Sequence, residues 1–210
     1  MITIGIPVYQ EVDLLDVTGP HEIFSWMNDP PNPPVVDIQL VAASLCDIKT
    51  RAGFVFKPNR TFDTASKLDV LWVPGGAPDA LTREMNPDGA YIKYLKKRSG
   101  AKWICSVCEG AILLAASGLL DNHLVTTHWR FIPCLSKFKV KVAEGFPRFV
   151  LDGNRLTGGG ISSGLDEAFK LVELLTDYET AQDIQRTTQY YPCPPVASEL
   201  VPATDCLLWK

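Results

Sequence analysis

Two kinds of hydrophobic pattern alternate along the chain. Short apolar or β-branched runs predict buried strands, and longer segments with apolar residues every three or four positions predict helices. The predicted strands are "ITIGIPVY" at the start, "VVDIQLVAA", "LDVLWVPGG", "KWICSV" and "LVTTHW". The predicted helices are "DVTGPHEIFSWM", residues 88–97, "EGAILLAASGLL", "SSGLDEAFKLVELL" and residues 179–188. Because strands and helices alternate, we predict an α/β fold, a doubly wound and mostly parallel sheet with helices on both faces.

Cap and turn residues give the expected limits of these elements. Thr18 or Gly19 is expected to cap the first helix, with Pro20 in its first turn. Ser163 and Asp166 have the spacing of a capping box at the start of a later helix. "DGN" inside "RFVLDGNRLTGGG" predicts the turn of a β-hairpin.

We expect a single domain over residues 1–210. The sequence contains neither an internal repeat nor a linker long enough to separate two domains. "PPNPP" at residues 30–34 predicts a surface loop, because consecutive prolines block both helix and strand pairing. From about residue 191 a proline-rich tail follows, and its apolar residues are expected to pack on the body or across a dimer.

Charge and composition exclude several classes of partner. The chain has 20 basic and 24 acidic residues, a net charge of −4, and no basic cluster suited to nucleic acid. No apolar stretch reaches the roughly 18 to 20 residues that span a bilayer. The start, "MITIGIPVYQ", lacks the charged region and cleavage site of a signal peptide. We therefore expect a cytoplasmic protein that binds neither nucleic acid nor membrane and keeps its six cysteines reduced.

Residues 104–113, "ICSVCEGAIL", are the best candidate for chemistry. A predicted strand ends, a sharp turn carries Cys108, and a helix of small residues begins at once. A nucleophile at such an elbow stands above the sheet edge, and a helix N-terminus favours its thiolate. Gly110 and Ala111 allow close packing at the turn. Cys108 is thus predicted to be a nucleophile, and the alternative is an inert buried cysteine.

Cys105 and Cys108 also form a CxxC pair, which can be redox-active or bind metal. The two residues are an odd number of positions apart, so strand alternation sends their side chains to opposite sides. No second CxxC is present, and the three histidines form no ligand cluster. Neither a disulfide at this pair nor a metal site is expected.

Several motifs together resemble the ThiJ/PfpI superfamily, and most of all its isonitrile hydratase branch. They are "LDVTGPHEIF", "LDVLWVPGGAPD", "SVCEGAILLAASGLLDNHLVTTHW", "DGNRLTGGGISSGLDEAFKLVE" and "QYYPCPP". The resemblance runs from residue 1 to about residue 196. It implies a flavodoxin-like fold, a homodimer, a reactive cysteine at Cys108 and an acidic partner for it at Asp16. Without the resemblance, Asp16 would be an aspartate at a helix start.

Further site residues follow from the same resemblance. Gly75 and Gly76 match a glycine turn whose backbone N–H groups face the nucleophile, and His128 matches a histidine near the site. Gly160 and Ile161 lie in "GGGISSG", a loop expected at the carboxyl edge of the sheet, where ligands gather in such folds. Each also has a structural alternative: a backbone with positive φ for the glycines, and a satisfied histidine beside a tryptophan for His128.

Glu109 departs from the pattern of these relatives. Isonitrile hydratases usually carry threonine or serine after the cysteine, and proteolytic relatives carry histidine. We expect Glu109 to point toward solvent, where water and the helix dipole favour its charge. The alternative is a carboxyl that stays protonated against the cysteine sulfur.

The resemblance implies hydration of an isonitrile, a small molecule, to an N-substituted formamide, with no cofactor. In that reaction Cys108 attacks the terminal carbon, and Asp16 donates a proton and then positions water. Two alternatives stay open: a cysteine-based redox or stress sensor, and a glyoxalase-like enzyme of the same superfamily. Glyoxalase relatives typically present glutamate in the first-strand loop, so Asp16 favours the hydratase.

Overall fold

A seven-stranded sheet forms the centre of the chain in this computed structural model, which describes residues 1–29 and 35–209. Its strand order is β10-β11-β7-β6-β1-β2-β5, and all neighbours are parallel except the pair β10 and β11. The strands are β1 (Ile2–Pro7), β2 (Val36–Ala42), β5 (Arg60–Thr61), β6 (Val70–Val73), β7 (Trp103–Ser106), β10 (Phe149–Asp152) and β11 (Arg155–Gly158). The predicted mostly parallel sheet is confirmed, whereas the loop predicted at residues 30–34 lies outside the described residues.

Two short sheets of two strands flank the main one. One pairs β3 (Ile48–Lys49) with β4 (Val55–Phe56), and the other pairs β8 (Leu124–Val125) with β9 (Lys141–Val142). The predicted hairpin is present as β10 and β11, which pair through Asp152 and Arg155. Gly153 in its turn has φ of 61°, a conformation that glycine adopts without strain.

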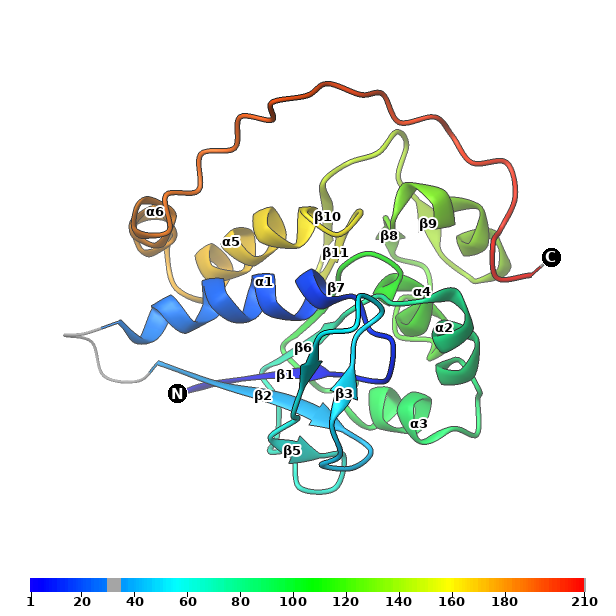
Figure 1. Cartoon of the computed structure of the whole chain (residues 1–210), viewed down its shortest axis with the longest axis horizontal. Helices are drawn as coiled ribbons and strands as arrows, with labels where there is room; N and C mark the ends of the chain where they lie inside the picture. The colour runs from blue at the N-terminus through cyan, green and yellow to red at the C-terminus, as the bar shows by residue number, and fades with distance from the viewer. Residues whose placement is uncertain (30–34, 210) are drawn as a thin grey trace.

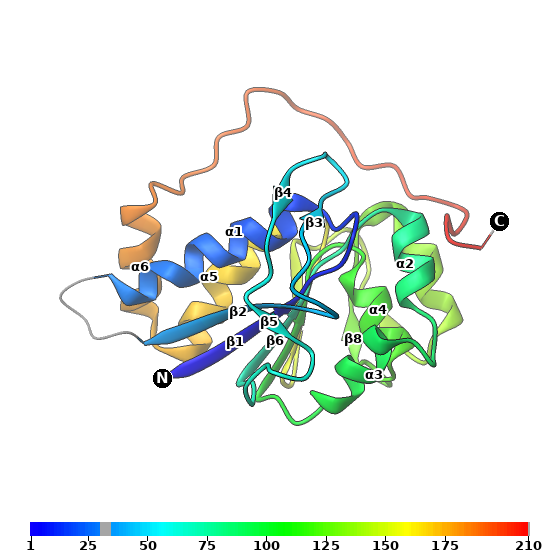
Figure 2. The same cartoon turned by 60° about the horizontal axis from the view of Figure 1, so that its bottom comes forward.

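Helices cover both faces of the sheet, as Figures 1 and 2 show. One face carries α1 (Leu14–Ser25) and α5 (Ser163–Leu175), which pack on each other, with α6 (Tyr178–Thr187) beside α5. The other face carries α2 (Pro78–Glu84), α3 (Ala90–Lys97) and α4 (Gly110–Ala116). Two 3₁₀ helices, η1 (Trp26–Asn28) and η2 (Trp129–Lys137), complete the set. Among the described residues, none of the helices has the length and apolar character needed to cross a bilayer.

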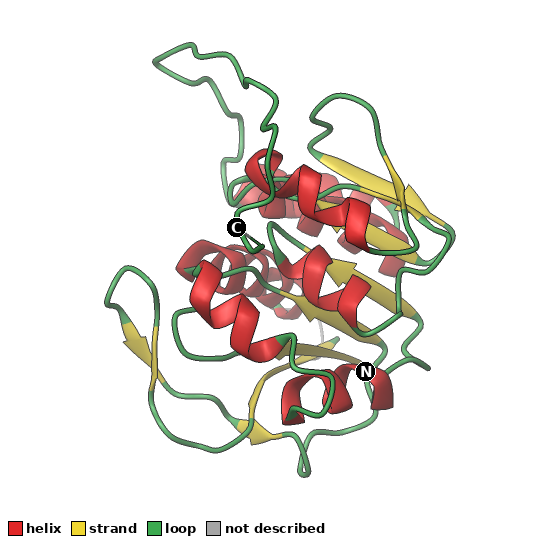
Figure 3. Cartoon of the chain, turned by 90° about the vertical axis from the view of Figure 1, so that its right-hand side faces the viewer, coloured by secondary structure: helices red, strands yellow, loops and turns green. Residues whose placement is uncertain are grey.

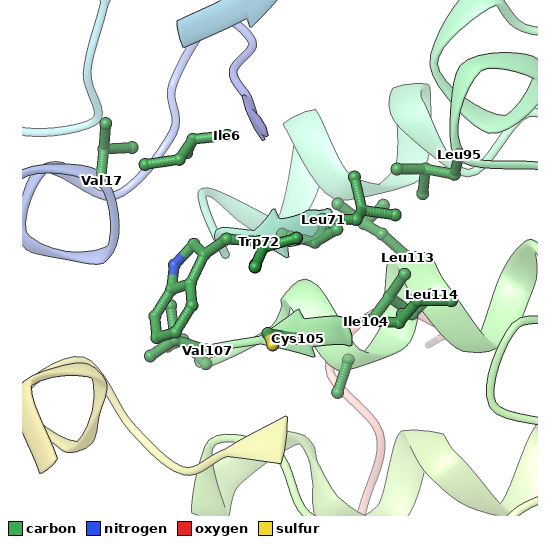
Figure 4. Close-up of a cluster of buried hydrophobic side chains, with 14 of the residues drawn as sticks. Ile6, Val17, Leu71, Trp72, Leu95, Ile104, Cys105, Val107, Leu113 and Leu114 are labelled. Atoms are coloured by element: carbon green, nitrogen blue, oxygen red, sulfur yellow. The ribbon is translucent and has the colours of Figure 1, made fainter. Parts of the chain in front are cut away.

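Strand alternation builds a core on each side of the central strands (Figure 4). Trp72 of β6 is fully buried on the α1 side, where its ring meets Phe24 edge-on with centroids 5.4 Å apart. Leu71, the preceding residue, points the other way, toward Leu113 of α4. Both faces of β6 are therefore buried, which explains its uninterrupted apolar sequence.

Helix α1 begins at Leu14, after Asp13, so the predicted cap at Thr18 or Gly19 is wrong. Pro20 stands inside the helix instead of in its first turn. Because proline has no N–H, it leaves the carbonyl of Asp16, four residues earlier, without a helical partner. That carbonyl accepts a hydrogen bond from the indole Nε1 of Trp72 at 3.1 Å. Pro20 thus frees the group that ties Asp16 to the central strand β6.

The capping box predicted at Ser163 and Asp166 is also wrong. Ser163 is already inside α5, and the carboxylate of Asp166 serves tertiary contacts instead. It accepts hydrogen bonds from Arg148 Nε at 2.6 Å and from the hydroxyl of Tyr190 at 2.9 Å. The partners of the Asp166 carboxylate are therefore Arg148 and Tyr190, from distant segments, and not the local backbone N–H that a capping box would use.

The C-terminal tail stands away from the body over most of its length (Figures 1 and 3). Several apolar tail residues are exposed, including Val196 at 79% and Val201 at 68%. The end of the tail returns to η2, where Cys206 forms a disulfide with Cys134. The expectation that all six cysteines stay reduced is therefore wrong. The two partners are 72 positions apart, and only the tertiary path of the chain brings them together.

Candidate functional site

Cys108 occupies the sharp turn between β7 and α4. Its φ of 56° lies in the left-handed region that residues with a side chain rarely adopt, so the backbone is strained at the predicted sharp turn. Its N–H donates to the carbonyl of Gly159 at 2.8 Å, and its own carbonyl accepts from the hydroxyl of Thr127 at 2.7 Å. Gly110 is required beside it, because a Cβ at that position would collide with the carbonyl of Val73. The elbow is thus held by the backbone of Gly159 on one side and by the side chain of Thr127 on the other.

Asp16 reaches the same point from the first turns of α1. The side chain is fully buried, and Oδ2 accepts a hydrogen bond from the backbone N–H of Gly75 at 2.9 Å. A Cβ on Gly75 would lie 2.7 Å from the backbone nitrogen of Glu109 and 3.0 Å from the Asp16 carboxylate. Gly75 therefore permits the close approach of three segments. Its N–H serves Asp16, whereas the resemblance implied that it faces the nucleophile.

Three acidic side chains and one thiol converge here, and we call them the acid–thiol cluster: Asp13, Asp16, Cys108 and Glu109. The Cys108 sulfur and one carboxylate oxygen from each of the other three all lie within 4.8 Å of one another. Asp16, the expected acidic partner of Cys108, therefore has a carboxylate oxygen within 4.8 Å of the sulfur. Asp13, at the N-cap of α1, joins the cluster without having been a candidate from the sequence.

Glu109 lies inside this cluster, so the expectation that it points toward solvent is wrong. Only 2% of the residue is exposed. Burial raises its pKa from 4.5 to about 7, and Asp13 adds to this, while its contact with Cys108 and the nearby Arg51 act in the opposite direction. At neutral pH the carboxyl is therefore divided between its protonated and charged forms. The missing side chain of Gly75 leaves the space that Glu109 fills.

The sulfur of Cys108 is fully buried, which contradicts the expected access above the sheet edge. Burial, followed by the carboxyl groups of Asp16 and Glu109, raises the pKa of this thiol well above its usual value. The backbone N–H of Ile161 acts in the opposite direction. Burial together with Glu109 also raises the pKa of Asp16 well above its usual range. The resting site thus holds a neutral thiol among partly protonated acids, and not the thiolate that the helix N-terminus predicted.

A surface cavity of about 340 Å³ lies beside the elbow. Its lining includes Gly160 and Ile161 from the loop after β11, His128, Arg148, and Leu200 of the tail. Ile161, whose φ is 23°, lines this cavity, and its backbone N–H also contacts the Cys108 sulfur. The ring of His128 packs directly on Gly160, and its Nδ1 accepts from the Arg130 N–H at 3.2 Å.

Burial and nearby arginines lower the pKa of His128, so its imidazole is neutral at pH 7. The structure thus places His128, Gly160 and Ile161 together at the cavity. Gly76 does not line this cavity and packs on Tyr9 and the carbonyl of Glu11.

Sequence reasoning missed two residues near the elbow. Thr127 anchors the Cys108 carbonyl, and no local pattern marks it. Glu167 on α5 is fully buried behind the elbow, in the space that the missing side chain of Gly158 leaves. Burial and then Asp16 raise its pKa well above the usual value. Its position one turn before Leu171, on the buried face of α5, was the available signal.

The chain belongs to the DJ-1/PfpI family, whose model matches residues 3–174. Isonitrile hydratase of Pseudomonas putida is 35% identical over 201 residues, which cover 94% of this chain and 82% of that protein. The regulator GlxA of Rhizobium meliloti, an HTH-type transcriptional regulator, is 35% identical over 101 residues, 47% of this chain and 30% of its own length. The family around this chain therefore includes an enzyme and regulators.

Solved structures agree with this assignment. A ThiJ/PfpI family protein from Pseudomonas syringae is 34% identical with a TM-score of 0.85, over 93% of this chain and 77% of that one. DJ-1beta of Drosophila melanogaster is 16% identical with a TM-score of 0.78, over 91% and 99% of the two chains, and shares the fold. The flavodoxin-like α/β fold implied by the resemblance is confirmed.

Proposed function

We propose that this protein is an enzyme of isonitrile hydratase type, which converts an isonitrile and water to an N-substituted formamide. The observation that carries the proposal is the acid–thiol cluster, a buried cysteine at an elbow with carboxyl groups against its sulfur. The 35% identity to an isonitrile hydratase over nearly the whole chain supports the same reaction. The catalytic residues are Cys108, Asp16 and Glu109.

The first step uses the two carboxyl groups in opposite protonation states. Glu109, with a pKa of about 7, accepts the proton of the Cys108 thiol as sulfur attacks the terminal carbon of the isonitrile. Asp16, whose pKa is raised by burial, is protonated and donates its proton to the same carbon. The product is a thioimidate in which a C–S bond and a C–H bond have formed.

Water completes the reaction and restores each group. The oxygen of a water molecule adds to the thioimidate carbon, and the Asp16 carboxylate accepts a proton from that water. Protonated Glu109 gives its proton to the substrate nitrogen. The C–S bond then breaks as the carbonyl forms, and Glu109 carries the hydroxyl proton to the departing sulfur. Cys108 is again a thiol, Asp16 is protonated and Glu109 is charged, so the cycle closes without a cofactor.

Burial of the thiol favours this electrophile over the alternatives. The reacting carbon of an isonitrile is terminal and unsubstituted, so it needs less room than a substituted carbon to approach the buried Cys108 sulfur. A dicarbonyl presents a substituted carbon, which demands more room. Oxidation of a sensor cysteine proceeds through a thiolate that is stable at rest, whereas the raised pKa of Cys108 keeps it a thiol until a base such as Glu109 accepts its proton. Both alternatives are therefore less well supported.

A substrate comparison tests the proposal. The purified chain is incubated with a simple alkyl isonitrile or with methylglyoxal, and formamide or lactate is followed by NMR. We expect formamide from wild type and from Cys105→Ser, a control that alters an equally buried thiol outside the cluster. Cys108→Ser and Asp16→Asn should reduce turnover by at least about 100-fold, the usual scale for acid–base and nucleophilic groups. Lactate without formamide, or equal turnover in Cys108→Ser, would rule out the proposed reaction.

A further inference from the structure

The donor atoms of the acid–thiol cluster have the composition of a metal site. Three carboxylates and one thiol present oxygen and sulfur within 4.8 Å of one another. All four residues are buried: Asp16 and Cys108 are fully covered, Glu109 is 2% exposed and Asp13 is 8% exposed. They come from two segments at one edge of the sheet: the N-cap and first turn of α1, and the elbow before α4.

A second observation points to a ligand. Each carboxyl group of the cluster keeps one buried oxygen with no hydrogen-bond partner among the described residues: Asp13 Oδ2, Asp16 Oδ1 and Glu109 Oε2. Buried polar atoms are normally paired, so three unpaired oxygens in one place need an explanation. Within the described ranges the cluster has one ion pair, between Arg51 and Asp13 at 3.7 Å, and Arg51 is more than half exposed.

We propose that the acid–thiol cluster is a binding site for a divalent cation that accepts mixed sulfur and oxygen ligands, Zn²⁺ or Cd²⁺. The cation takes the places of the protons on Cys108 and the carboxyl groups, which are released to solvent. Tetrahedral zinc with one thiolate and three carboxylate oxygens holds its donors roughly 3.5 Å apart. The donors lie within 4.8 Å of one another, so each pair needs to close by about 1.3 Å at most, a movement within the reach of side-chain rotation.

The donor set also indicates which cations are excluded. Mg²⁺ and Ca²⁺ prefer oxygen ligands alone and a coordination number of six or more, so a thiolate in a four-donor site disfavours them. Cys105 provides an internal comparison: it is equally buried in β7, three positions before Cys108, but lies outside the group of donors. Binding to the cluster occupies the Cys108 sulfur, so the cation is expected to inhibit any reaction in which Cys108 acts.

The test measures binding directly and is independent of the proposed reaction. Cys46→Ser and Cys193→Ser are combined first, because both thiols are exposed and would bind soft cations weakly. Calorimetry with ZnCl₂ should then give one saturable site per chain with release of protons, and CdCl₂ should produce thiolate-to-metal absorption in the ultraviolet. MgCl₂ should produce neither, and Cys105→Ala should bind as tightly as its parent.

Cluster variants decide the assignment. Cys108→Ala should abolish the Cd²⁺ absorption, and Asp16→Asn and Glu109→Gln should each weaken Zn²⁺ binding by at least about tenfold, the lower range for groups that support a metal site. Circular dichroism confirms that each variant is folded, and if Cys108→Ala is not, the two amide variants still decide. Absence of saturable binding, Cd²⁺ absorption that survives in Cys108→Ala, or unchanged affinity in both amide variants would overturn the proposal.

Discussion

Glu109 should make the stability of this protein depend on pH in a direction opposite to that of most carboxylates. Its pKa is 4.5 in the unfolded chain and about 7 in the fold, chiefly because of burial. Between these values the folded state keeps a proton that the unfolded state releases. The free energy of unfolding therefore falls as pH rises from about 4.5 to about 7, and it stays reduced above that range.

The magnitude follows from the same two values. A rise in pKa from 4.5 to about 7 corresponds to about 3 kcal/mol of destabilisation once the group is ionised. Glu109→Gln removes the titrating proton and keeps the shape of the side chain. We expect the free energy of unfolding of this variant to exceed that of wild type by up to about 3 kcal/mol at pH 8 and to match it at pH 4.

Urea denaturation from pH 4 to pH 8 in metal-free buffer measures this difference. Glu144→Gln is the matched control, because Glu144 is exposed and lies outside the cluster. The diagnostic quantity is how the difference in free energy of unfolding between variant and wild type changes with pH. Loss of a contact alone would change the stability by the same amount at every pH. A difference that stays constant from pH 4 to pH 8, or one that falls as pH rises, would refute the buried, protonated state of Glu109.

Three further predictions concern other parts of the structure. Gly75→Ala should lower the free energy of unfolding by about 1 to 3 kcal/mol, because its Cβ would overlap the backbone of Glu109, and unchanged urea stability would contradict this packing. Thiol titration of the denatured, unreduced chain should find four cysteines, rising to six after reduction, because Cys134 and Cys206 are joined, and six before reduction would show that the disulfide does not form. Light scattering should report twice the chain mass of 23.2 kDa, since a homodimer would cover the exposed apolar tail, and a monomer at micromolar concentration would disprove it.

Local sequence determined the frame of the protein. Buried strands such as β6 are apolar on both faces, and this pattern alone predicts a central position in a parallel sheet. The hairpin turn at Gly153 and the elbow at Cys108 were likewise predictable, since each depends on neighbours within a few positions. The helix starts were less so: Asp166 looked like a capping residue, but Arg148 and Tyr190 bind its carboxylate.

Only the tertiary structure decided the chemistry of the site. Sequence patterns place Glu109 in a first helical turn, where solvent and the helix dipole favour a charged carboxylate. Its actual environment is set by Asp13 and Asp16, about a hundred positions earlier, and by the space beside Gly75. The protonation of a group depends on the charges and water around it, and those come from distant segments. The link between Cys134 and Cys206 near the end of the tail has the same origin, because the two sulfurs are 72 positions apart and only the folded path of the chain brings them together.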